Sequence, residues 1–489
     1  MRATNVLFFT LSLIFAFFDP LDQEAYRVYM LCGFFWLYNI GQFYYLPDKR
    51  FFFIKPIFCF FVATFLSSLG MATNFFVVKN QQEIFAPEFN SGQFMIKDYG
   101  IYLKTLLAIN IASIAAWMGY QSYWGISLYK KYAYNSIYAR VFNSEIDNNK
   151  LLIFGLLAYL IKAYLFSIGL FGRMVDERFF EAGVGYKDGS QLRIFANASL
   201  LFLFLFGVHT FRNFKQKNIL ILGVCLAIEL VYGFAYAARS AIVYPFVLVF
   251  VAHYFVRRKL NVGMIAGLAA VVLFAFSVGL DFKNYALSTG YQKASNPLEA
   301  IQEFGAYKEV YTDYSATSAE EGYQTLMGNS NHSRIAAIAI KYEDDGRNNM
   351  YKEKAHPGFF LSFLRVPLDA VVPKFLQGTT EFPWGLWFKD EVLQHNTHII
   401  YSIGMTSIGF LYFTGGFIAI FLGFYFQGIL LRFNEQFLFE KKILYILQFL
   451  ILFSFLVEFD SVVYAIYTNL IRVLFLYPAA YWLLAKKNN

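Results

Sequence analysis

A late polar stretch, from about residue 282 to about residue 401, carries side chains that could do chemistry. It holds four cations that could bind phosphate or carboxylate: Arg334, Arg347, Arg365 and Lys374. Arginine offers an anion a bidentate fork, whereas lysine offers a point charge. Each charge-assisted contact contributes roughly 1.5–3 kcal/mol. The stretch is therefore a candidate anion site, although the same cations could be solvated or paired with acidic neighbours.

Two arginines in earlier loops have the same chemistry. Arg239 lies in a tight turn between two long apolar segments, and no acidic residue is near it in sequence. This position favours an anion anchor at the mouth of a helical bundle; the alternative is an arginine that snorkels to lipid headgroups. Arg178 lies in another basic loop, in which Asp176 and Glu177 dilute the charge. Both loops are candidate parts of an anion site.

The late stretch also offers general bases and aromatic rings. His395 and Asp369 lie near the predicted outer membrane surface, where either could take a proton from a hydroxyl. His395 and His398 are three residues apart, but no third ligand follows from the spacing, so no metal is predicted. Trp384 and Trp387 could stack on sugars or anchor the segment at the interface. The chain has no Asp-x-Asp pair, no P-loop and no Gly-x-Ser-x-Gly elbow.

The elements that must position these residues are membrane helices. Of 489 residues, 58% are hydrophobic and only 15% are charged. The apolar residues form continuous blocks that could cross ~30 Å of hydrocarbon, which takes roughly 20 helical residues, whereas a β-barrel would alternate. We predict an all-α, polytopic membrane bundle of about twelve transmembrane helices. The predicted spans are 3–18, 27–46, 53–77, 101–124, 150–172, 193–212, 218–237, 240–256, 261–281, 405–430, 442–459 and 463–485.

Loop charge orients the chain, because Lys and Arg resist translocation. Both termini are predicted to be cytoplasmic, and the late stretch is then on the outer side. The net charge of +8 follows from the cytoplasmic loops and needs no nucleic-acid partner. The first span has the charged start and short apolar run of a signal peptide, but Ala16 to Asp19 is a poor cleavage site, so we predict a helix. The basic residues of the cytoplasmic loops are Lys49, Arg50, Lys55, Lys130, Lys131, Arg140, Arg212, Lys215, Lys217, Arg257, Arg258, Lys259, Arg432, Lys441 and Lys442.

The spans divide the chain into three predicted parts. Residues 1–281 form a first transmembrane bundle, residues 282–404 a large extracytoplasmic loop, and residues 405–489 the last three helices. Within the loop, amphipathic helices are predicted near residues 297–310 and 331–343. Residues 357–376 are too short and too charged to span, which indicates an interfacial segment.

Two ionisable residues are predicted inside the membrane at one depth. Lys162 and Glu229 each lie about eleven or twelve residues from the cytoplasmic start of their spans, at ~1.5 Å per residue. Buried charges of this kind face the bundle interior and pair with one another. We therefore predict a Lys162–Glu229 pair. Two interpretations stay open: a pair that orients helices, or a role in ion coupling.

In topology and local motifs the chain resembles the Wzy-type polysaccharide polymerases, which include the O-antigen polymerases. The local motifs are Ala-Arg239-Ser240 after a long span, the Arg365 to Lys374 segment with its two prolines, and Thr406-Ser407-Ile408-Gly409-Phe410 followed by Gly415-Gly416. Some members carry an Arg, ten residues and a Gly in two outer loops, which matches Arg178 to Gly189 and Arg347 to Gly358.

The resemblance implies a metal-independent glycosyltransferase without a cofactor. It would transfer a glycan from undecaprenyl pyrophosphate to a hydroxyl of the next lipid-linked repeat unit, at the outer face of a bacterial inner membrane. A flippase and a chain-length regulator are the implied partners. Pyrophosphate would bind Arg239, Arg334, Arg365 and Lys374; sugar or a second phosphate would bind Arg178 and Arg347; the base would be His395, with Asp369 as the second choice.

Two other functions stay open. An O-antigen ligase uses the same donor, and His395-Asn396 before a glycine-bearing span is similar to it. A flippase or transporter of lipid-linked oligosaccharides would also suit about twelve spans with both ends inside. Transporters built from repeats show two similar halves, however, and the sequence has no internal repeat.

Overall fold

The computed structural model describes a helical protein. It covers residues 2–18, 24–46, 54–62, 64, 99–167, 175–176, 186–235, 239–257, 262–278, 282, 304, 332–346, 399–400, 406–457 and 463–486. Within these ranges the only regular β-structure is a two-residue antiparallel ladder, in which β1 (Val175–Asp176) pairs with β2 (Ile399–Ile400). The prediction of a helical bundle is confirmed for the described residues.

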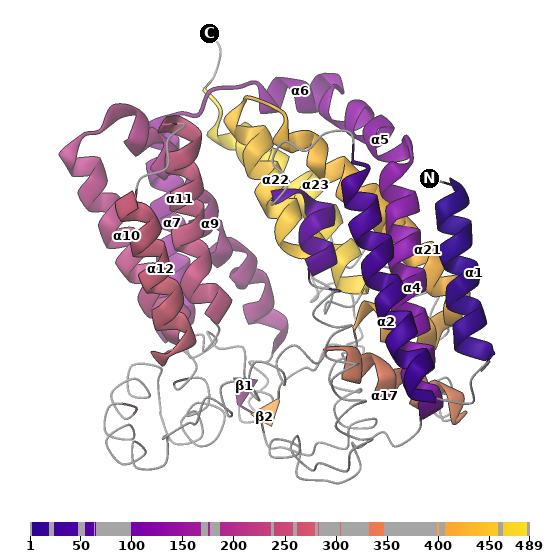
Figure 1. Ribbon diagram of the computed structural model, residues 1–489. Coiled ribbons are helices and arrows are strands. Elements are labelled where there is room, and N and C mark those ends of the chain that lie inside the picture. Colours follow the sequence, from indigo (N-terminus) through magenta and orange to yellow (C-terminus); the bar gives the residue numbers. More distant parts are fainter. Residues whose placement is uncertain are drawn as a thin grey trace.

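The helices form two groups, shown on the right and left of Figure 1. The first group contains α1 (Arg2–Phe17), α2 (Glu24–Tyr44), α4 (Tyr99–Gln121), α21 (Ser407–Leu438), α22 (Ile443–Leu456) and α23 (Val463–Leu484). The second contains α7 (Asn148–Ser167), α9 (Tyr186–Asn213), α10 (Gln216–Ala235), α11 (Arg239–Arg257) and α12 (Val262–Phe276). The first and last helices of the chain therefore pack together, and the middle helices form a separate group.

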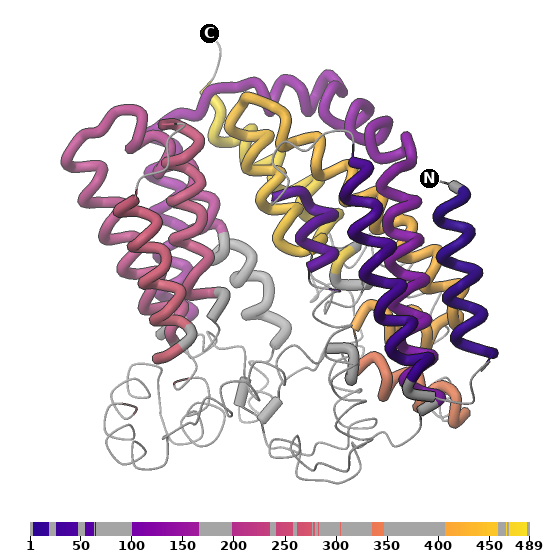
Figure 2. The backbone as a smooth tube through the Cα atoms, in the orientation of Figure 1, coloured from indigo at the N-terminus to yellow at the C-terminus, as the bar shows by residue number. Residues whose placement is uncertain are grey.

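Three shorter helices lie at the two ends of the bundle. α5 (Trp124–Ala133) and α6 (Ser136–Phe142) lie at the end that also carries both chain termini (Figures 1 and 2). α17 (His332–Asp344) lies at the opposite end and packs against α4 and α21. For brevity we call the first the terminal end and the second the distal end.

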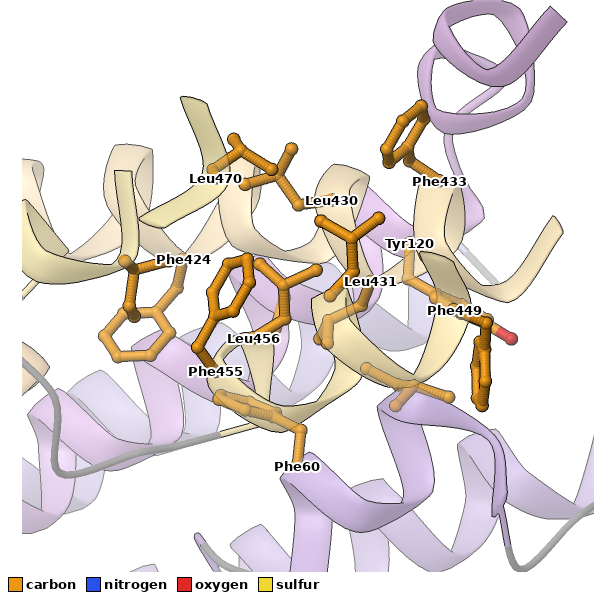
Figure 3. Close-up of a cluster of buried hydrophobic side chains, with 14 of the residues drawn as sticks. Phe60, Tyr120, Phe424, Leu430, Leu431, Phe433, Phe449, Phe455, Leu456 and Leu470 are labelled. Atoms are coloured by element: carbon orange, nitrogen blue, oxygen red, sulfur yellow. The ribbon is translucent and has the colours of Figure 1, made fainter. Parts of the chain in front are cut away.

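The closest helix packing is between α4 and α21, where two glycines remove the side chains that would separate the backbones. A methyl group added at Gly119 would lie 1.9 Å from the carbonyl oxygen of Tyr425, and one at Gly428 would lie 2.0 Å from that of Ala116. Small residues allow helices in a membrane to approach in this way. Around this contact large apolar side chains fill the space between α21, α22 and α23, among them Phe424, Leu431 and Phe455 (Figure 3).

In the described part of the chain, three helices are long and apolar enough to cross a membrane by length and composition: Gly100–Gln121, Gln216–Phe234 and Ser407–Leu438. Six shorter apolar helices accompany them among the described residues. These features are compatible with a membrane protein.

The predicted helix positions agree with the structure where it can be compared. The spans predicted at 3–18, 150–172 and 240–256 correspond to α1, α7 and α11, and the helix predicted at 331–343 corresponds to α17. α21 continues to Leu438, beyond the predicted end at residue 430. α5 and α6 were not predicted. Residues 357–376, and most of 53–77 and 297–310, lie outside the described residues.

Candidate functional site

A buried charged cluster joins α7, α9 and α10 of the second group. The Nζ of Lys162 donates to Glu229 Oε2 at 2.5 Å and to Ser199 Oγ at 3.0 Å. The Ser199 hydroxyl donates in turn to Glu229 Oε1 at 2.7 Å, so both carboxylate oxygens have a donor. The Lys162 and Glu229 side chains are only 7% and 4% exposed. The predicted pair is confirmed, and Ser199 is a member that the sequence did not reveal.

The surroundings of this cluster are aromatic. The Lys162 ammonium lies 4.9 Å from the ring centroid of Tyr232 and 6.0 Å from that of Tyr159. Aromatic faces stabilise a cation when it is withdrawn from water. Glu229 precedes the distal end of α10 by six residues, a rise of roughly 9 Å. The cluster therefore lies near the distal end of α10, the helix that precedes Arg239 in sequence.

A second buried charged network, which sequence reasoning missed, joins the first group near the terminal end. Lys55 and Tyr120 both donate to the carboxylate of Glu435, and Arg432 Nη1 donates to Glu435 Oε2 at 2.8 Å. The side chains of Lys55 and Glu435 are 1% and 0% exposed. Lys55 and Arg432 were predicted to be loop charges; this is corrected, because Lys55 is buried and Arg432 lies within α21. The sequence signal for this network was a single glutamate, Glu435, near the end of a long apolar helix.

The late polar stretch is attached to the distal end at α17. Asp344, the last residue of α17, accepts from Lys104 Nζ of α4 at 2.6 Å. Its other carboxylate oxygen accepts from the hydroxyl of Tyr412 on α21 at 2.9 Å. The apolar face of α17, with Ala336, Ala337 and Ile340, is buried. The position of α17 is thus fixed by packing and by one carboxylate.

A second attachment is the β1–β2 ladder, which joins two loops that are far apart in sequence. Val175 pairs with Ile400, and Asp176 pairs with Ile399. In sequence, Arg178 follows Asp176 by two residues, and His398 directly precedes Ile399. The ladder therefore pairs a residue two positions before Arg178 with a residue four positions after His395.

Of the predicted site residues, only Arg239 and Arg334 lie on described backbone. Arg239 is the first residue of α11, and Arg334 lies in the first turn of α17, but the side chains of both are outside the described set. The remaining predicted residues lie outside the described residues altogether: Arg178, Arg347, Arg365, Asp369, Lys374, Trp384, Trp387 and His395. Their assignments stay predictions.

α21 is interrupted close to its distal end. Gly415 is extended at φ −174°, and Gly416 has φ 61° and ψ −150°, a conformation that glycine adopts without steric cost. Thr406 caps the short segment before the break by accepting from Gly409 N at 3.2 Å. Gly415-Gly416, which belongs to one of the motifs that carry the family resemblance, is therefore the position at which α21 is broken.

Within the described residues, no three His, Cys, Asp or Glu side chains gather in a way that could hold a metal ion. The chain matches no protein-family profile, no curated protein and no solved structure at a significant level.

Proposed function

We propose that this chain is a membrane polysaccharide polymerase that joins lipid-linked oligosaccharide repeat units at the outer face of a bacterial inner membrane. The proposal includes the orientation predicted from loop charge, with the terminal end cytoplasmic and the distal end outside. The resemblance to the Wzy-type polymerases suggests the reaction. The chemistry of the distal end is compatible with it.

The observation that carries the proposal is the return of the late stretch to the distal end of both helical groups. α17 packs on α4 and α21 of the first group. β2 pairs with β1, which lies between α7 and α9 of the second group in sequence. A segment tied to both groups at one end can cover a lipid-linked substrate whose polar part emerges from the membrane.

The start of α11 is a suitable place for a pyrophosphate. α11 begins at Arg239, so a cationic residue coincides with a helix N-terminus, which carries about half a unit of positive charge. Backbone N–H groups of a first helical turn bind phosphate oxygens. α10 and α11 approach closely here, because a methyl group at Gly233 would lie 2.7 Å from the carbonyl oxygen of Ala241. This close approach of the two helices near the start of α11 supports precise placement of the anion.

The proposed reaction is a single displacement at the anomeric carbon of the donor glycan. The acceptor hydroxyl oxygen forms a bond to that carbon, and the bond from the carbon to the pyrophosphate oxygen breaks. The pyrophosphate leaves with the bonding electrons, and the base, His395 or Asp369, takes the hydroxyl proton. Cations near the leaving group stabilise the charge as it develops. Arg239, Arg334, Arg365 and Lys374 are the proposed cations.

The break in α21 supports a polar environment at the distal end. Non-helical backbone at membrane depth is tolerated only where it is buried in protein or meets water. Gly415 is exposed in the structure. We therefore infer that Gly415 faces water or substrate, and the break gives the backbone of α21 groups that could contact a sugar.

One observation favours a second candidate function, a flippase or transporter. Buried ionisable residues in the membrane often couple ion movement to transport, and Lys162 with Glu229 is such a pair. A broken helix is also common at transporter binding sites. An O-antigen ligase remains the other enzyme candidate, on the basis of His395-Asn396 alone.

Replacement of Arg239 separates these candidates. In a strain that lacks the chromosomal gene, Arg239→Ala is expected to reduce polymerisation at least tenfold, through loss of a charge-assisted contact of roughly 1.5–3 kcal/mol. Surface glycan is then resolved by length on a gel. A polymerase variant leaves single repeat units on the surface, a ligase variant leaves none attached, and a flippase variant traps the units inside.

The matched control is Arg212→Ala, which removes an exposed arginine at the terminal end of α9. It should leave the length distribution unchanged. If Arg239→Ala protein is present in the membrane at the normal level and glycan length and amount are unaltered, Arg239 is not part of the site.

A further inference from the structure

A cavity of about 660 Å³ lies at the terminal end, far from the proposed catalytic end. It is formed where the end of α6, the start of α7 and the end of α23 meet. Its polar lining includes Arg140 and Asn143 from the α6 side, Lys150 from the first turn of α7 and Lys486 after α23. Trp482 provides an aromatic wall.

The backbone around this cavity is held by hydrogen bonds between distant parts of the chain. Ile146 and Ala485 form an antiparallel bridge. Asp147 N donates to Leu484 O at 2.9 Å, and Lys486 N donates to Glu145 O at 2.9 Å. These bonds attach the end of α23 to the connection between α6 and α7. The cavity is therefore preformed.

Two cations of the lining keep donors for a ligand. Lys150 Nζ donates to Ala485 O at 2.6 Å, which leaves two of its three protons. The Arg140 side chain is exposed in the last turn of α6. Lys486, by contrast, pairs with Glu145 at 2.9 Å, and this bond lowers the pKa of Glu145. The nearby carboxylate of Asp147 accepts from the backbone N–H groups of Asn149 and Lys150.

An uncovered apolar surface continues from the cavity along α7. Ile153, Leu157, Leu160 and Tyr164 follow Lys150 at spacings of three and four residues, so they share one face of the helix. Each of the four is more than half exposed. On the α23 side, Trp482 and Leu483 are both 65% exposed. A basic pocket beside an apolar stripe is complementary to a phospholipid, which has an anionic headgroup and apolar acyl chains.

We propose that this cavity binds the phosphate headgroup of an anionic phospholipid from the leaflet at the terminal end. Arg140 and Lys150 contact the phosphate, and an acyl chain lies along the stripe from Ile153 to Tyr164. Basic pockets between helices on the cytoplasmic side suit such headgroups, and tryptophan favours the interface. The lipid would join the two helical groups, because the cavity is lined by α6 and α23 on one side and by α7 on the other. The proposal requires the membrane orientation but not the polymerase activity.

Native mass spectrometry of the purified full-length chain in detergent tests the proposal. The probes are phosphatidylglycerol, phosphatidylcholine with the same acyl chains, and inorganic phosphate. We expect one phosphatidylglycerol to be retained at least tenfold more tightly than phosphatidylcholine, and Arg140→Gln to lower that affinity about tenfold. Lys131→Gln, which removes an exposed lysine of α5 outside the cavity, should have no effect. Asn143→Asp adds a negative charge to the lining, should weaken retention as well, and serves as the test if Arg140→Gln does not fold.

Three results would overturn the proposal. Equal retention of the two lipids would show that no anionic headgroup is selected. Equal loss in Arg140→Gln and Lys131→Gln would place the lipid elsewhere. Displacement of the lipid by inorganic phosphate at equal concentration would show that the cavity binds a free anion and that the apolar stripe contributes nothing.

Discussion

The two buried charged clusters differ in the donors that surround their carboxylates. Around Glu435, the donors are a lysine, a tyrosine and an arginine from three separate parts of the chain. Around Glu229, the donors are one lysine and one serine, and the rings of Tyr232 and Tyr159 lie beside the lysine ammonium. The first cluster lies near the terminal end, and the second lies near the distal end. In the proposed function, the second cluster is the one that lies closer to the substrate.

This difference suggests different roles. A buried ion pair need not stabilise a fold relative to an apolar pair, but the loss of one partner is severe because it leaves a charge without compensation. The Glu435 network ties residues of the first helices to α21, so it specifies which helices pack together. The Glu229 cluster joins α7, α9 and α10, which are already neighbours in sequence, so its charges are less necessary for assembly.

The largest effect is expected for Glu435→Gln, which leaves the buried ammonium of Lys55 without its carboxylate. The free energy of unfolding should fall by about 3–5 kcal/mol. Thermal unfolding of the detergent-purified protein measures it. Glu440→Gln is the control, because Glu440 accepts from Tyr129 and Tyr134 at a partly exposed position. If both variants lose the same free energy of unfolding, the Glu435 network stabilises the helix packing no more than the Glu440 contacts do.

A smaller effect is expected for Lys162→Met, because Ser199 still donates to Glu229. The expected loss is about 1.5–3 kcal/mol, the contribution of a hydrogen bond to a charged group. The double variant Lys162→Met with Glu229→Gln removes both charges and distinguishes the two interpretations of the pair. A structural pair predicts normal surface glycan from the folded double variant. Glycan trapped inside, with normal thermal stability, would instead support ion coupling and a transporter.

The smallest effects concern packing, where the two helical groups also differ. Gly428→Ala should cost about 1–3 kcal/mol, because the new methyl group meets the backbone of α4, which cannot move aside. Gly155→Ala in α7 should cost less, because its methyl group meets the ring of Phe202 at 2.4 Å, and a ring can turn. Thermal unfolding of the two variants shows which substitution lowers the stability more. A reversed order would show that the first group is the more adaptable one.

Residue patterns predicted most of the long described helices, but not α5 and α6, and one of the two charged clusters. Continuous apolar blocks indicated where α7, α10 and α11 lie, and equal depth predicted the Lys162–Glu229 contact. The depth of a residue along its helix does not show which side chains lie beside it, however. Neither Ser199 nor the Lys55–Glu435 pair was therefore predicted. Nor does sequence order show that α21 packs on α4, because the glycines that permit this contact, Gly119 and Gly428, lie more than 300 positions apart. For the candidate site, the ladder pairs Val175 with Ile400 and Asp176 with Ile399, and no motif in the sequence indicates this contact.

The α4–α21 contact has a consequence for synthesis in the cell. Some 290 residues separate the end of α4 from the start of α21. At ~5–20 residues per second, α4 waits roughly 15–60 s for its main partner. During that time α2 can hold it through polar contacts, such as those of Asn39 Oδ1 with Ser113 and Trp117. The helices from α7 to α12 are inserted in the interval. A ribosome that stalls before α21 would therefore release a chain whose middle group is complete, while its first group still lacks the carboxylate that Lys55 requires.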